Sequence, residues 1–71
     1  MNGNQQDVPQ IWTDLIEEMI RQKIPLEFQR PVFQMLNDKQ MKIMLDWLIE
    51  NRDVPYYSLD LMKKAREISK L

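Results

Sequence analysis

The sequence of 71 residues contains no cysteine and no histidine, and its only glycine is Gly3. Without these two residue types the chain has no disulfide, no zinc site of the common kinds and no imidazole to act as an acid or a base. Neither a Ser-His-Asp triad nor a Cys-His pair can be assembled. One glycine near the N-terminus does not make a phosphate-binding loop or a dinucleotide fingerprint. We therefore expect a protein that is not an enzyme and that uses no cofactor and no metal.

Carboxylates remain as candidates for acid-base chemistry. Asp14, Glu17 and Glu18 lie close together in the sequence. The spacing of their apolar neighbours places them, with Arg21, on the side of a helix that faces away from its apolar stripe. A general acid or a metal cage needs carboxylates that converge in a pocket. We expect these carboxylates to form a solvated face.

Long apolar runs and a strong net charge are also lacking. No apolar run approaches the roughly 20 residues of a membrane-spanning helix. The first six residues have neither the basic region nor the apolar stretch of a secretory signal. The formal net charge of -1 does not favour nucleic acid or an anionic membrane as a partner of the whole molecule. We expect a cytoplasmic protein with no membrane partner.

The composition that is present is globular, with 44% hydrophobic and 30% charged residues. A chain of this length has room for one domain. We expect residues 1–6, which are mostly polar, to form a flexible tail, and residues 7–71 to form a single helical domain. So small a core, with no disulfide or metal, is often completed by self-association. The composition leaves a homodimer and a monomer equally open.

Apolar residues at helical spacing predict an all-α fold, a small bundle of three to four short helices. Asp7 as N-cap, with Pro9 in the first turn, suits the start of the first helix, and Pro25 favours its end. Pro31 removes a backbone donor, so we expect a break near that residue. No stretch alternates apolar and polar residues as a half-buried strand does.

The second half of the chain carries two further helix signals. Asn37 followed by Gln40 approximates a capping box, and the helix that it opens has a wide apolar arc, which predicts the hub of the core. Ser58 is the expected N-cap of the last helix, with Asp60 in its first turn. The predicted helices span about 9–23, 26–36 with a break near Pro31, 38–51 and 58–69.

Aromatic residues and methionine are abundant, with two tryptophans, two tyrosines, two phenylalanines and six methionines. Such side chains anchor protein interfaces when they lie at a surface. Tyr56 and Tyr57 are adjacent, so they must point in different directions and at least one should be exposed. The candidate protein-binding residues are Trp12, Met19, Tyr56 and Tyr57. The alternative is that these residues belong to the core with incidental exposure, as we expect for Trp47.

The C-terminal segment is locally basic. Its cations could reach nucleic-acid phosphates from one helix, and they are Lys63, Lys64, Arg66 and Lys70. The connection that precedes this helix is longer than the turn of a helix-turn-helix, and no base-reading cluster opens the helix. Cations that complement the dipole near a helix C-terminus explain the same residues without nucleic acid.

Three functional hypotheses follow from these patterns. The first is a small regulatory or adaptor protein that binds another protein through an apolar helical surface, an interaction that can inhibit the partner. The second is a nucleic-acid-binding protein of the transcriptional-regulator type that uses the basic last helix. The third is a structural subunit of a larger assembly. The abundance of aromatic and methionine side chains favours the protein-binding hypothesis.

Overall fold

The computed structural model describes residues 8–71, and all of its regular secondary structure is helical. The α-helices are α1 (Gln10–Arg21), α2 (Leu26–Met35), α3 (Asp38–Glu50) and α4 (Leu61–Ser69), and the short 3₁₀ helix η1 (Tyr56–Ser58) lies between α3 and α4. The prediction of an all-α bundle with three to four short helices is confirmed. The predicted tail at residues 1–6 and the predicted Asp7 cap lie outside the described residues.

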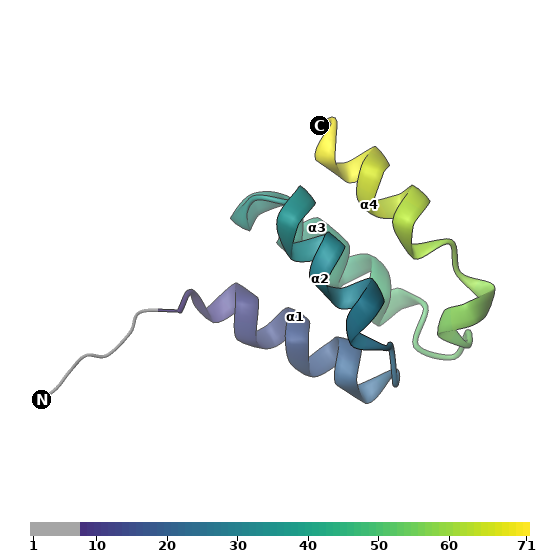
Figure 1. Ribbon diagram of the computed structural model, residues 1–71. Coiled ribbons are helices and arrows are strands. Elements are labelled where there is room, and N and C mark those ends of the chain that lie inside the picture. Colours follow the sequence, from purple (N-terminus) through teal and green to yellow (C-terminus); the bar gives the residue numbers. More distant parts are fainter. Residues whose placement is uncertain (1–7) are drawn as a thin grey trace, which may run out of the picture.

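Helix α3 is the hub of the bundle, as its wide apolar arc predicts. It packs against α1 and α4, while α2 packs against α4. Figure 1 accordingly shows α1 and α4 on opposite sides of α2 and α3. The core consists of twelve buried apolar side chains, of which α3 supplies more than any other helix: Leu15, Met19, Ile24, Val32, Leu36, Met41, Met44, Leu45, Leu48, Leu61, Ala65 and Ile68.

The first helix has a well-defined stop. Pro9 occupies the N-cap position and not the first turn as predicted, so α1 starts at Gln10. Lys23 adopts a left-handed conformation with φ of 61°. The Lys23 amide donates to the Ile20 carbonyl and the Ile24 amide donates to the Met19 carbonyl, both at 2.9 Å. These two bonds form a Schellman motif, which normally uses glycine at the left-handed position. The motif ends α1 two residues before the predicted boundary and turns the chain into α2.

The predicted break near Pro31 is wrong, because α2 runs unbroken through this proline (Figure 1). Pro31 removes only the hydrogen bond that residue 31 would donate to the Glu27 carbonyl. Gln29 and Val32 are buried on the two sides of the proline, and the Gln29 side chain donates to the Ile24 carbonyl at 2.7 Å. Tertiary contacts therefore hold a helical backbone that the local sequence disfavours.

We expect Pro31→Ala to raise the free energy of unfolding by about 1–2 kcal/mol, since alanine restores the missing donor and has the higher helix propensity. Urea unfolding followed by far-UV circular dichroism measures the change. Pro25→Ala is the matched control, because Pro25 precedes the same helix, and its loss should instead lower stability by up to about 1 kcal/mol through the unfolded chain. A destabilised Pro31→Ala variant would show that ring packing outweighs the lost bond.

Of the predicted N-caps of α3 and α4, one is confirmed and the other is wrong. The capping box is confirmed: the Gln40 amide donates to Asn37 Oδ1 and the Asn37 amide donates to Gln40 Oε1, each at 2.9 Å. The predicted Ser58 cap is wrong. Ser58 lies in η1, and Asp60 caps α4 by accepting the Lys63 amide at 3.1 Å. Because Leu59 is extended, with φ of -97° and ψ of 138°, the helix starts after Asp60.

Candidate functional site

The four residues predicted to form one protein-binding surface do not lie together. Trp12 is partly exposed near the start of α1, where its ring centroid is 5.7 Å from that of Phe33 and its indole nitrogen donates to Asp38 Oδ1 at 3.0 Å. Met19 is only 1% exposed and belongs to the core, so its assignment to the surface was wrong. It follows Leu15 by one helical turn on the side of α1 that the other helices cover.

The two tyrosines lie in η1, beside a hollow in the surface. Tyr57 is 77% exposed, while Tyr56 is partly buried against the core. Their ring planes are inclined by 83°, with centroids 5.6 Å apart. The exposure of Tyr57 confirms the prediction that at least one of the adjacent tyrosines is exposed. Tyr56 also contacts Phe28 of α2, with centroids 6.3 Å apart. Both tyrosines and Phe28 line a hollow of about 300 Å³.

A larger groove opens between α1 and α2, with a volume of about 660 Å³. The groove opens between these two helices because α1 packs mainly on α3, and α2 packs mainly on α4. We name it the α1–α2 groove. Its walls are mainly apolar, and its lining consists of Ile16, Ile20, Ile24, Leu26, Gln29, Arg30, Phe33 and Gln34.

The sequence reasoning missed the most exposed apolar residues of this groove. Ile20 and Leu26 are each 62% exposed. The available signal was the row formed by Trp12, Ile16 and Ile20, which repeats every four residues and runs beside the buried pair Leu15 and Met19. Only one of two adjacent rows can face the core of a small bundle. Trp12 extends the groove surface because its ring contacts Phe33, which lines the groove.

The basic last helix presents three of its four predicted cations on one exposed side. Lys63, Arg66 and Lys70 are exposed and follow one another at spacings of three and four residues. Lys64 is partly buried, and its ammonium group lies 5.5 Å from the centroid of the Trp47 ring. This cation–π contact gives Lys64 a structural partner within the chain. The exposed basic strip is therefore limited to three residues.

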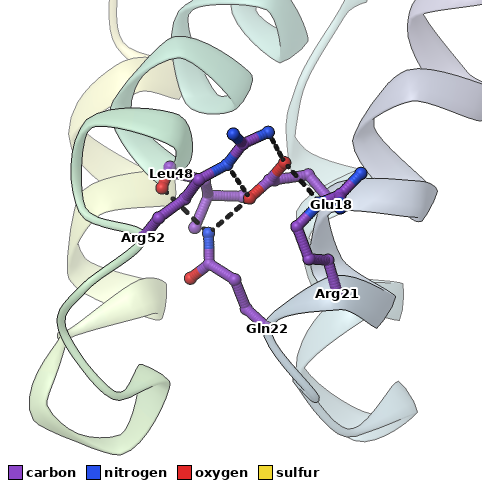
Figure 2. Close-up of polar contacts among 5 residues, drawn as sticks. All are labelled: Glu18, Arg21, Gln22, Leu48 and Arg52. Atoms are coloured by element: carbon purple, nitrogen blue, oxygen red, sulfur yellow. Dashed lines mark hydrogen bonds and ion pairs between the residues drawn. The ribbon is translucent and has the colours of Figure 1, made fainter.

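A buried carboxylate joins α1 to the segment that follows α3, contrary to the prediction of a solvated acidic face. Glu18 is 4% exposed and accepts hydrogen bonds from Arg52 Nε at 3.0 Å and Arg52 Nη2 at 2.8 Å. Gln22 Nε2 donates to Glu18 Oε2 at 2.9 Å and to the Leu48 carbonyl at 2.8 Å (Figure 2). Arg21 Nε lies 3.4 Å from Glu18 Oε1 and forms a second ion pair. The bidentate Arg52 contact is the main link of this network.

The network changes the acidity of Glu18. The hydrogen bonds from Arg52 lower the pKa of Glu18 from 4.5 to about 2, against the effect of burial, which raises it. The same contact raises the pKa of Arg52. Both shifts favour the ionised pair. The Glu18 carboxylate finds its partners within the chain, while Gln22 Oε1 is buried without a hydrogen-bond partner among the described residues. We assign the network to the fold.

Residues 8–71 contain no cluster of metal ligands and no membrane-spanning helix. No group of three or more acidic residues is placed to hold a metal ion in this part of the chain. None of the described helices is long and apolar enough to cross a membrane.

The chain was also compared with known proteins. It matches no protein-family model, no curated protein and no solved structure. Two surfaces thus stand out by their geometry alone, the α1–α2 groove and the hollow beside the tyrosines.

Proposed function

We propose that this protein is a small non-catalytic adaptor or regulator that binds another protein in the α1–α2 groove. The observation that carries the proposal is the exposure of Ile20 and Leu26, at 62% each, on the two sides of one apolar groove. Contiguous exposed apolar surface of this kind is typical of interaction sites. Covering these two side chains would contribute about 1–2 kcal/mol each to binding.

The proposed occupant is an amphipathic helix of the partner. A trough between two helices accepts a third helix, whose apolar face then contacts both walls. Among residues 8–71, Arg30 is the only charged residue in the lining, so the partner helix should carry an acidic residue that faces it. Residues 1–7 of the chain itself contain a single apolar residue, Met1, and do not supply the apolar face that this groove needs.

Site-specific photo-crosslinking in cells that naturally express the protein tests this assignment. A crosslinking amino acid in place of Ile20 or Leu26 should give one dominant adduct with another protein. Ile43 and Ile49 are the matched controls, because they are 42% and 40% exposed on α3 and do not line the groove. We expect no such adduct from these two positions.

The captured partner then has to satisfy the chemistry of the groove. Its crosslinked segment, made as a peptide, should bind the purified full-length protein, and Ile20→Glu or Leu26→Glu should weaken binding about 30-fold or more. Ile49→Glu should change binding less than about threefold. Arg30→Glu should weaken binding about tenfold, and exchange of the acidic peptide residue for lysine should restore it.

Other outcomes would contradict the proposal. An adduct of twice the mass of the chain would show that a second copy fills the groove, which is the homodimer that the composition left open. Equal adducts from Ile20 and Ile49 would show that the groove has no special role.

A nucleic-acid-binding function is the second candidate, favoured by the exposed strip of Lys63, Arg66 and Lys70. Phosphate contacts by three cations would make the affinity fall with salt, with a log–log slope of about -3 for duplex DNA per bound copy. Exposed Glu67 lies within the same helix and weakens the field of this strip. Nucleic acid in the crosslinked adducts, in place of protein, would favour this candidate.

A further inference from the structure

The hollow beside η1 has a lining different from that of the α1–α2 groove, and the two share no residue. Three aromatic residues contribute to it: Phe28 from α2, and Tyr56 and Tyr57 from η1. We name it the aromatic hollow. Leu59, Leu61 and Met62 supply the other apolar contacts, and Asp60 is the only charged lining residue in the described part of the chain.

The three rings are arranged as walls and not as a stack. Phe28 and Tyr56 are inclined by 52°, and Tyr56 and Tyr57 by 83°. Rings at such angles can present aromatic surface from several directions to one small guest. The negative potential of an aromatic face attracts cations, and aromatic cages recognise alkylated ammonium groups in this way.

Asp60 adds a full negative charge in a fixed position. Its Oδ1 atom accepts the Lys63 amide at 3.1 Å, so the role of Asp60 as the N-cap of α4 holds the carboxylate at the hollow. Lys63 and Lys64 of α4 line a neighbouring hollow with Trp47, and Asp60 borders that hollow as well as the aromatic one. Within residues 8–71, no cation lines the aromatic hollow itself.

The exposure of Tyr57 also points to a ligand, in addition to the aromatic lining and the Asp60 carboxylate. At 77% exposed, its ring contributes little to the core, yet it stands edge-on to Tyr56 at 5.6 Å beside the hollow. A volume of about 300 Å³ is at the small end of ligand sites, and it suits a small organic group better than a helix.

We propose that the aromatic hollow, with the Asp60 carboxylate at its margin, is a binding site for an alkylammonium cation. Methylated or larger ammonium groups fit best, because their alkyl surface contacts the rings and Met62 while their charge is balanced by Asp60. The cation is either the head of a free quaternary amine or the side chain of a modified lysine on a peptide, and both present the same chemistry.

A titration of the full-length protein, followed by the NMR signals of the aromatic rings, tests the proposal with a matched pair of probes. Choline should cause saturable shifts of the Phe28, Tyr56 and Tyr57 signals, with a dissociation constant of about a millimolar. Its neutral isostere 3,3-dimethylbutan-1-ol has the same shape without the charge and should bind about five- to tenfold more weakly. Sodium chloride at equal concentration controls for ionic strength.

Three variants separate the charge from the rings. Asp60→Asn keeps a good N-cap but removes the charge, so α4 should persist while choline binding weakens about three- to tenfold. Tyr57→Ala should abolish the shifts, and Tyr57→Phe should retain them. Far-UV circular dichroism of each variant checks that the helices are intact.

The source of the cation is resolved by a further arm, in which a short neutral peptide carries one trimethyl-lysine. Tighter binding of this peptide than of choline would identify a side chain of another protein as the ligand, and equal binding would identify a free amine. Binding of the neutral alcohol as tight as that of choline would overturn the proposal. An unchanged choline affinity in Asp60→Asn, or shifts confined to residues outside the hollow, would overturn it as well.

Discussion

Leu48→Ala is expected to lower the free energy of unfolding by about 3–4 kcal/mol, which would leave the protein close to its unfolding threshold. Leu48 is 0% exposed and lies on α3, the helix that packs against both α1 and α4. The truncation removes buried apolar surface and leaves a cavity that a small bundle closes only in part. A domain of 71 residues has a total stability of roughly 4–10 kcal/mol, so the loss is a large share of it.

Urea unfolding followed by tryptophan fluorescence measures this effect. Ile49→Ala is the matched control, because Ile49 is the next residue of the same helix and is 40% exposed. It should cost about 1 kcal/mol or less. Equal losses from the two variants would show that α3 does not bury the face described above.

Glu18→Gln is expected to cost about 2–3 kcal/mol at pH 7. The amide has nearly the shape of the carboxylate, but it brings N–H donors toward Arg52, which has only donors, and it leaves that guanidinium without its partner. Chemical denaturation at pH 7 gives the value. Glu17→Gln, on the exposed side of the same helix, should change stability by less than about 0.5 kcal/mol.

Glu18 also makes stability depend on pH in a defined window. Its pKa in the folded protein is about 2, below its ordinary value of 4.5, so the unfolded chain binds the proton more readily between these values. The contribution of Glu18 is therefore fully present above about pH 4.5 and is lost as the pH falls toward 2. Because Arg52 is 48% exposed, water screens the pair, and we expect a loss of about 1–2 kcal/mol over the window.

Unfolding curves of the parent and Glu18→Gln between pH 5 and pH 2 isolate the contribution of Glu18 to the free energy of unfolding. The difference in stability between the two proteins should shrink as the pH falls through the window. A difference that stays constant from pH 5 to pH 2 would show that Glu18 does not carry the depressed pKa.

Helix positions were predictable where the deciding contacts are local. The capping box joins Asn37 to Gln40, three residues away, so both halves of the signal are visible in the sequence. Ser58 and Asp60 are both acceptable caps by residue type. The choice between them depended on the extended backbone at Leu59, which packs partly against the core, and no local pattern encodes that packing.

The candidate binding surfaces were less predictable, for a related reason. Helix α1 carries two adjacent apolar rows, and its sequence does not say which of them the other helices will cover. The structure covers Leu15 and Met19 and leaves Ile16 and Ile20 at the groove. The sequence did predict that at least one of the adjacent residues Tyr56 and Tyr57 is exposed, and the structure exposes Tyr57.

The sequence by itself determined that this protein is helical, where most of its helices begin and end, and which catalytic residue types it lacks. These properties depend on composition and on hydrogen bonds between residues at most about five positions apart. The tertiary structure decided that α2 continues through Pro31, that Glu18 is buried against Arg52 at a separation of 34 residues, and that a groove opens between α1 and α2. Each of these depends on contacts between distant segments, which form only when the helices pack together.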